Sequence, residues 1–157
     1  MTDVTEFRVN GHKLYLSPVM DLYNGEIIAW ETSGRPHQQM VIKMVQSACC
    51  KLGSLDQPIL HSDQGWQYKL DGYQALLLQR GIKQSMSRKG NCLDNAAMEN
   101  FFSHLKSELF YIEKFDSVDQ LRVSIDEYIH YYNHERIKLK LGGLSPVEYR
   151  TQSLLAA

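Results

Sequence analysis

Three features are scarce in this sequence: long apolar runs, paired cysteines and an excess of positive charge. No apolar run approaches the ~20 residues that cross a bilayer, and no charged and then apolar stretch resembles a secretory signal, so we expect no membrane contact. The three cysteines include the neighbours Cys49 and Cys50, which do not make a disulfide framework, so the cytoplasm is the expected compartment. The 17 basic against 18 acidic residues give a net charge of −1, so any binding of nucleic acid must depend on local sites.

The first third of the chain predicts an antiparallel meander. Asn10-Gly11 and Asn24-Gly25 are typical of two-residue hairpin turns, in which both central residues need positive φ. The segments beside them, residues 2–9, 13–22 and 26–32, are rich in β-branched and aromatic side chains. We therefore expect three antiparallel strands.

Helices and strands alternate in the rest of the chain. The pattern predicts, in order, a helix over residues 36–53, a strand over 58–61, a helix over 70–80, a strand over 82–86, a helix over 94–109, and two helices that begin at capping boxes at Ser117 and Ser145. Strand, helix, strand in this order implies parallel pairing. We predict one α/β domain over residues 1–157. It has a mixed five-stranded sheet, three antiparallel and then two parallel strands, with helices on both faces and C-terminal helices from about residue 117.

Three acidic residues lie on three different predicted elements. Asp3 is on the first strand, Asp63 follows the fourth strand, and Glu99 is on the long helix, with 35 residues between it and Asp63. If the first and fourth strands are neighbours, Asp3 and Asp63 meet where the chain direction switches, which is where open α/β sheets bind ligands. Carboxylate oxygens suit Mg²⁺ or Mn²⁺. Without metal, clustered carboxylates repel one another, and at least one is expected to resist ionisation.

Further motifs extend this pattern over nearly the whole chain. They are Thr2-Asp3-Val4-Thr5, Asp21-Leu22-Tyr23 with Ile28-Ala29-Trp30, the run from His61 to Tyr68, the run from Ser85 to Lys106, Tyr131-Tyr132-Asn133 with Arg136, and Leu144-Ser145-Pro146 with Tyr149. With these motifs the chain closely resembles the catalytic domain of bacterial insertion-sequence transposases, which is related to retroviral integrases and carries a DDE triad.

The resemblance implies an RNase H-like fold and a metal-dependent DNA reaction. Asp3, Asp63 and Glu99 would be the catalytic triad and would hold Mg²⁺ or Mn²⁺, two ions per site. Such ions, roughly 3.5–4 Å apart, activate the attacking oxygen and stabilise the leaving oxygen. Family members nick a transposon end and join its 3′-hydroxyl to target DNA. The expected partners are therefore transposon-end and target DNA and, in a bacterial cytoplasm, further copies of the chain.

Four DNA contacts and one supporting residue are predicted near the triad. Lys106 lies two turns beyond the triad glutamate on the same helix face, and Asn95 one turn before it, so both would follow a phosphate backbone. Arg88 and Lys89 lie in the preceding polar loop, which resembles the mobile loop at the mouth of such sites. His61 is expected to support the metal ligands or to be a buried, hydrogen-bonded histidine. For the basic residues, the alternative is a solvated surface charge.

Several other polar side chains have simpler explanations. Asp94 and Asp21 are rival acids, but their positions indicate a helix cap and a turn residue. His130 and His134 lie four residues apart on a helix without the glutamate of the metalloprotease pattern, so they indicate a surface pair. The basic run at residues 136–140 is either a DNA contact or a charged turn.

Three functions remain open from the sequence. The first is a DNA strand-transfer core, the second a nuclease of the same fold that cuts without joining, and the third an inactive remnant that only binds a full-length transposase or DNA. Family proteins carry an upstream helix-turn-helix half that reads the transposon ends, and nothing before Asp3 resembles it. We therefore expect that half to be a partner rather than a part of this chain.

Overall fold

The strands at the start of the chain form an antiparallel sheet with a turn at each end of the middle strand. In this computed structural model, which describes residues 1–53, 55–88 and 95–155, the three strands are β1 (Thr5–Val9), β2 (His12–Met20) and β3 (Ile27–Ser33). Asn10 and Gly11 have φ of 49° and 82°, so the predicted two-residue turn between β1 and β2 is confirmed.

The second predicted two-residue turn is wrong. β2 ends at Met20, and six residues separate it from β3. Of this loop only Gly25 has positive φ, 74°. The Asn24 side chain is buried and donates to the Pro146 carbonyl at 2.9 Å and to Glu26 at 3.2 Å. These long-range contacts outweigh the local preference of an Asn-Gly pair for the hairpin turn.

Two parallel strands complete the sheet. β4 (Ile59–Ser62) pairs in parallel with β5 (Lys83–Met86). Thr2 connects this pair to the antiparallel strands, because it forms a bridge with Val19 of β2 and its amide donates to the His61 carbonyl at 2.8 Å. The start of the chain therefore lies between β2 and β4, as the predicted mixed five-stranded sheet requires.

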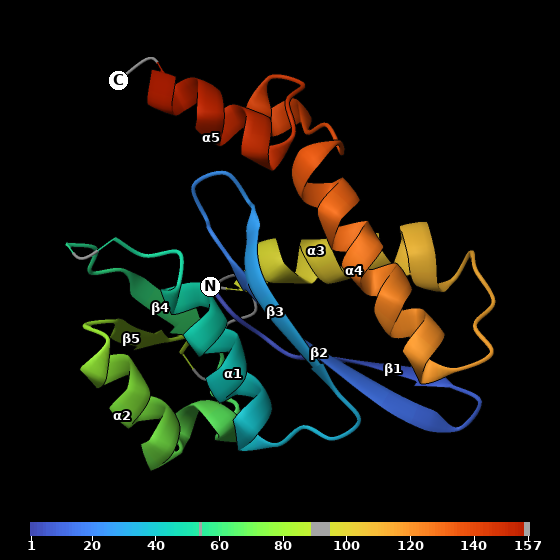
Figure 1. The fold of residues 1–157 in the computed structure, drawn as a ribbon, viewed down its shortest axis with the longest axis horizontal. Helices are drawn as coiled ribbons and strands as arrows, with labels where there is room; N and C mark the ends of the chain where they lie inside the picture. Colours follow the sequence, from blue (N-terminus) through green and yellow to red (C-terminus); the bar gives the residue numbers. More distant parts are fainter. Residues whose placement is uncertain (54, 89–94, 156–157) are drawn as a thin grey trace.

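Helices cover both faces of the sheet, as predicted (Figure 1). The helices are α1 (Gln38–Cys49), the 3-10 turn η1 (Trp66–Lys69), α2 (Asp71–Gln79), α3 (Ala96–Leu105), the π-helical turn η3 (Lys106–Phe110), α4 (Val118–His134), the 3-10 turn η4 (Leu139–Leu141) and α5 (Pro146–Leu155). α1 and α2 form one apolar core with β4, and α3 and α4 form another with β1 and β2. No helix in the described part of the chain is long and apolar enough to cross a bilayer.

The two C-terminal helices begin at the predicted capping boxes. The Gln120 amide donates to the Ser117 hydroxyl at 3.2 Å, and the Ser145 amide donates to the Glu148 carboxylate at 2.8 Å. The predicted helix over 94–109 differs in its last part, because its backbone loosens to a π turn after Leu105.

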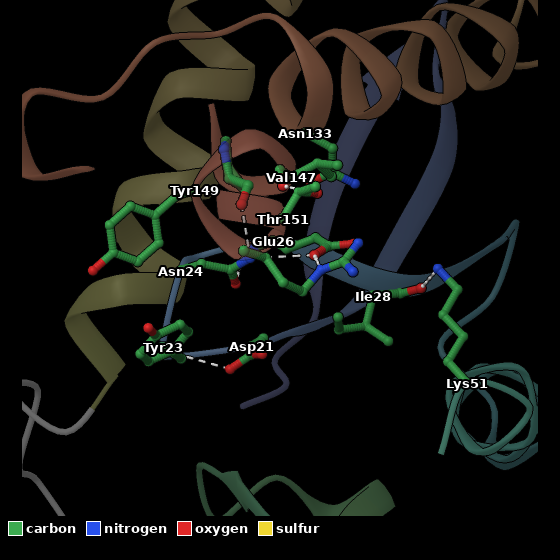
Figure 2. Close-up of polar contacts among 12 residues, drawn as sticks. Asp21, Tyr23, Asn24, Glu26, Ile28, Lys51, Asn133, Val147, Tyr149 and Thr151 are labelled. Carbon is green, nitrogen blue, oxygen red and sulfur yellow. Dashed lines mark hydrogen bonds and ion pairs between the residues drawn. The ribbon is translucent and has the colours of Figure 1, made fainter. Parts of the chain in front are cut away.

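A polar cluster fixes α4 and α5 to the loop between β2 and β3 (Figure 2). The Asn133 side chain at the end of α4 accepts from the Ile27 amide at 2.8 Å and donates to its carbonyl at 3.0 Å. Arg150 of α5 forms a 2.7 Å ion pair with Glu26, which is 6% exposed. The C-terminal helices are therefore bound to the sheet by specific polar contacts as well as by apolar packing.

Candidate active site

Asp3 lies beside the junction of the two strand ladders. Its neighbour Thr2 is held between β2 and β4, which sets the position of Asp3 relative to the end of β4. One carboxylate oxygen of Asp3 accepts from the Val4 amide at 2.7 Å, and the other accepts from the Asn95 side chain at 2.7 Å. Asp3 is therefore fixed by its neighbour Val4 and by the residue that begins α3. It lies just before β1, which starts at Thr5, and not on the first strand as predicted.

Asn95 has a different place from the one expected. It is the residue that begins α3, and it is 8% exposed. Its amide nitrogen donates to Asp3, and its amide oxygen Oδ1 has no hydrogen-bond partner among the described residues. A buried side chain that is turned towards an acid differs from the phosphate contact predicted from the sequence.

Asp63 follows β4 in a tight loop. Its Oδ1 accepts from the Gly65 amide at 2.8 Å. A Cβ atom on residue 65 would lie 2.9 Å from that oxygen and 2.8 Å from the Gln67 side chain, which is too close for any other residue without a shift. Gln64 donates to the Ser87 carbonyl at 3.1 Å, so the loops after β4 and β5 are connected. The role of Gly65 was not identified from the sequence. The available signal was its position, two residues after Asp63.

His61 lies behind this loop on β4. Its Nδ1 lies 2.9 Å from the Ser85 hydroxyl and its Nε2 lies 3.1 Å from the Ser87 hydroxyl, so both ring nitrogens have partners on or beside β5. Its carbonyl also accepts from the Thr2 amide. The imidazole holds the ends of β4 and β5 together, and its influence on the acids stays a prediction.

Glu99 lies on the first turn of α3 and is exposed. Its closeness to the other acids is seen in the pKa of Asp3, which is raised mainly by burial and further by repulsion from Asp63 and Glu99. The hydrogen bonds from Val4 and Asn95 oppose this rise. The three acids therefore come from three separate parts of the chain, and the charges of Asp63 and Glu99 both act on Asp3.

The donor atoms are suitable for a hard divalent cation. The three side chains offer only oxygens, and the unpartnered Oδ1 of Asn95 adds a neutral buried one beside Asp3. Within the described residues, no three His, Cys, Asp or Glu side chains are grouped closely enough to hold one ion. Glu99 is exposed, so its side chain has the rotamer freedom to approach the two aspartates.

The basic residues that we predicted to contact DNA differ in how exposed they are. Lys106, the first residue of η3, is half-buried with its amine 5.5 Å from the centre of the Phe7 ring, and its contact with DNA stays a prediction. Arg88 is exposed after β5. Lys89 and the rival acid Asp94 lie outside the described residues.

The remaining polar residues named in the sequence analysis make contacts away from the three acids. Asp21 accepts from the Tyr23 amide at 2.9 Å, so it is a turn residue, as predicted. His130 and His134 are both exposed on α4, and their rings stack with centres 4.5 Å apart. Arg136 forms an ion pair with Glu108 at 2.6 Å and so connects the end of α4 to the π turn.

The sequence matches one protein family along its length. The Integrase core domain family matches residues 1–92, and a second family of the same description matches residues 99–154. The putative transposase InsK for insertion sequence element IS150 of Escherichia coli is 57% identical over 155 residues, which cover 99% of this chain and 55% of that protein. An uncharacterized transposase-like protein of Haemophilus influenzae is 57% identical over 153 residues, which cover 98% of this chain and 70% of that protein. The chain therefore spans only about half of the length of the InsK relative.

Solved structures share the fold. The catalytic core domain of HTLV-2 integrase, in complex with magnesium, has a TM-score of 0.72 at 16% identity and covers 94% of this chain and 92% of that chain. The catalytic core domain of BIV integrase has a TM-score of 0.64 at 16% identity and covers 98% of this chain and 94% of that chain. At such identities the likeness concerns the fold alone, which is RNase H-like. Together with the sequence matches, it leads to one conclusion: the chain belongs to the integrase core domain family of insertion-sequence transposases.

Proposed function

We propose that this chain is a catalytic core that cuts DNA strands and joins them to new partners in transposition. Asp3, Asp63 and Glu99 would hold Mg²⁺ or Mn²⁺, two ions per site, against the phosphodiester. The observation that supports the proposal is that the pKa of Asp3 is raised by burial and further by repulsion from Asp63 and Glu99, which come from a loop and a helix elsewhere in the sequence. Carboxylates gathered at the cost of mutual repulsion are typical of a functional site.

Each triad residue has a distinct part in this reaction. Asp3 and Asp63 are fixed by the sheet and by the donors Asn95 and Gly65. A carboxylate offers about four acceptor sites, so each aspartate keeps lone pairs that can bind an ion in addition to these hydrogen bonds. Glu99 would close the site from α3. When bound, the ions would activate an attacking oxygen and stabilise the leaving oxygen. Water and a DNA 3′-hydroxyl are both oxygen nucleophiles, so the same site serves cutting and joining.

The proposed partners follow from the relatives. The InsK relative is named as a transposase and is almost twice as long as this chain, so we infer that a helix-turn-helix half, in the same or another chain, selects the transposon ends. We propose that the chain acts in the bacterial cytoplasm. Its other partners there would be transposon-end DNA, target DNA and further copies of the chain. Arg88, Lys89 and Lys106 would contact phosphates rather than bases, because phosphate contacts position DNA without reading its sequence.

The decisive experiment separates joining from cutting. Duplex DNA that carries the inverted repeat at the end of the insertion sequence, labelled at the 5′ end of the strand whose 3′-hydroxyl is to be joined, is incubated with the chain, an unlabelled plasmid and Mg²⁺ or Mn²⁺. Joining produces labelled DNA of plasmid size, whereas a simple nuclease produces only shortened labelled strands. Labelled plasmid is the expected product. If neither product forms even when a helix-turn-helix half is supplied, the chain is a remnant and the proposal is wrong.

Glu99→Gln tests whether the third acid is catalytic. The exposed side chain keeps its shape, so the variant is expected to unfold at the wild-type temperature while losing nicking and joining. Glu108→Gln is the matched control on the same helical segment. It removes the charge that pairs with Arg136, so it is expected to lower the melting temperature and to retain nicking at low temperature. Full activity of Glu99→Gln would contradict the triad.

Metal binding has its own test that needs no DNA. A ligand that binds only the folded state stabilises it, by about 2.7 kcal/mol at ~100 times its Kd. For a chain of this size that corresponds to a rise in melting temperature of roughly 5–10 °C. Wild type is expected to show this rise with Mn²⁺, and Asp63→Asn is expected to lose most of it. An equal rise in both proteins would place the metal elsewhere.

A further inference from the structure

A polar groove lies beside the candidate active site, between α3, the loop after β2 and the segment from Arg136 to Leu141. Its volume is about 590 Å³, within the range of sites that hold a drug-sized molecule. Ala97 and Asn100, on either side of Glu99 in the sequence, line one wall. A strand of DNA bound at the triad would therefore lie next to this groove, which we call the α3–α5 groove because Tyr149 of α5 lines its far end.

Arg136 in the α3–α5 groove is paired with Glu108 outside it, whereas the amine of Lys138 has only neutral partners. Among the described residues that line it, none is Asp or Glu. The Lys138 amine donates to the Tyr132 hydroxyl at 2.8 Å and to the Gly25 carbonyl at 3.2 Å, and it lies 4.1 Å from the centre of the Tyr132 ring. These three partners are neutral. Burial, and then repulsion from Arg136 and Lys140, lowers the pKa of Lys138 to about 8. An anion bound here would relieve that repulsion.

The same groove presents aromatic rings. Tyr23 is 63% exposed, and its ring centre lies 5.7 Å from that of Tyr149 at a tilt of 48°. Figure 2 shows both rings on one side of the loop that follows β2. Cationic grooves with aromatic rings are the usual binding sites for single-stranded nucleic acid, because bases stack on the rings while phosphates contact the cations. A base inside a duplex is already stacked on its neighbours, so only an unpaired stretch can use Tyr23 in this way.

We propose that the α3–α5 groove holds a short single-stranded stretch of DNA next to the active site, with Lys138 and Lys140 facing phosphates and Tyr23 stacking on a base. This inference depends on the proposed function only for the source of the strand. A protein occupant, including a second copy of the chain, would have to bring carboxylates to Lys138 and Lys140. DNA supplies phosphates along its whole length.

The test uses the whole chain, with EDTA present so that binding does not depend on metal. Fluorescence anisotropy compares a blunt duplex with the same duplex carrying a single-stranded tail of about four nucleotides, the lower end of single-strand site sizes. A third probe has the same tail without bases. Wild type is expected to bind the tailed duplex roughly 5-fold or more tightly than the blunt one, and the tail without bases is expected to lose most of that gain.

Two variants and two matched controls assign the effect to the groove. Tyr23→Ala is expected to remove the preference for the tail, whereas Tyr111→Ala, at a residue 73% exposed, keeps it. Lys140→Gln is expected to lower the slope of log affinity against log salt by about 0.7, the value for one contact on a single strand, and Lys114→Gln is expected to leave it unchanged. Both controls lie in the segment before α4, whereas the chain that carries Lys138 and Lys140 follows the other end of this helix (Figure 1). The 17 residues of α4 span roughly 25 Å.

The possible outcomes distinguish this proposal from the preceding one. Equal affinity for tailed and blunt duplexes, or equal behaviour of Tyr23→Ala and Tyr111→Ala, overturns the groove proposal and leaves metal-dependent cutting intact. A change in the oligomeric mass of Tyr23→Ala with unchanged DNA affinity also overturns it, in favour of a protein interface. Conversely, Asp63→Asn is expected to lose cutting while keeping the preference for the tail.

Discussion

Asn95 donates a 2.7 Å hydrogen bond to Asp3 across 92 residues of sequence. This bond joins the N-terminal end of α3 to the segment just before β1, and so it connects the helix that carries Glu99 to Asp3. The remaining amide oxygen of Asn95 is buried with no partner among the described residues. The role that this geometry supports is the positioning of Asp3 for metal.

Asn95→Ala is therefore expected to weaken Mn²⁺ binding. Loss of a residue that orients a metal ligand typically costs about 10–100-fold in metal affinity. Titration calorimetry with Mn²⁺ measures this directly. Asn95→Asp, which keeps the shape but adds a negative charge against Asp3, is expected to lower the stability of the metal-free protein. Unchanged Mn²⁺ affinity in Asn95→Ala would assign the residue a purely structural role.

Gly65→Ala is expected to impair the site without unfolding the protein. The backbone of Gly65 has a φ of −52° and a ψ of 143°, which alanine adopts freely, so the only obstacle is the contact of the new Cβ with Asp63 and Gln67. Displacing a catalytic group by about 1 Å can cost roughly 100-fold in rate. Plasmid nicking measures the loss.

Gly34→Ala is the matched control for this prediction. Its Cβ would meet no atom closer than 3.9 Å. Its activity and melting temperature are expected to stay at the wild-type values. Wild-type nicking by Gly65→Ala would mean that the position of Asp63 is not critical.

Removal of one triad charge is expected to stabilise the metal-free protein. Asp63 raises the pKa of Asp3 by repulsion, and Asp63→Asn removes that repulsion while its side-chain oxygen still accepts from Gly65. A repulsion between two partly solvated charges is worth at most about 1 kcal/mol, so the rise in melting temperature is expected to be about 4 °C or less. Thermal melts in EDTA measure the rise, and Glu113→Gln, at an exposed position, serves as the control. A lower melting temperature for Asp63→Asn would show that its charge is stabilising.

The lowered pKa of Lys138 gives a pH dependence with a definite sign. In the folded protein this pKa is about 8, against 10.5 for the free side chain, so the unfolded chain binds more protons between these values. The contribution of Lys138 to stability therefore rises as pH increases from about 8 towards 10.5. Tyr132, the ring beneath the amine, has its pKa raised to about 12 and stays neutral over this range.

DNA binding in the α3–α5 groove is expected to change with pH in the opposite sense. As pH rises through about 8, Lys138 loses the proton that makes it cationic, and affinity for the tailed duplex falls. Lys138→Arg keeps its charge over the whole range, because arginine has a pKa above 12, so its affinity is expected to vary less between pH 7 and 9. The anisotropy assay measures both proteins at constant salt. Parallel pH profiles would exclude Lys138 from the contact.

Local sequence determined much of this protein. Asn10-Gly11 specified its turn because both residues tolerate positive φ, and Ser117 and Ser145 specified helix starts because their capping contacts span only three residues. The order of helices and strands sufficed to predict the mixed sheet. It did not establish that the start of the chain lies beside β4, which the bond from the Thr2 amide to the His61 carbonyl shows.

Tertiary contacts decided the features that local patterns predicted wrongly or did not reveal. Asn24-Gly25 has the same turn signal as Asn10-Gly11, but the buried bond from Asn24 to Pro146, 122 residues away, gives it a longer loop. Asn95 resembled a surface phosphate contact, yet its amide is turned inward to Asp3. The α3–α5 groove joins residues near both ends of the chain. Such features depend on contacts between residues that are far apart in the sequence. Only folding brings these residues together, so no local sequence pattern indicates the contacts.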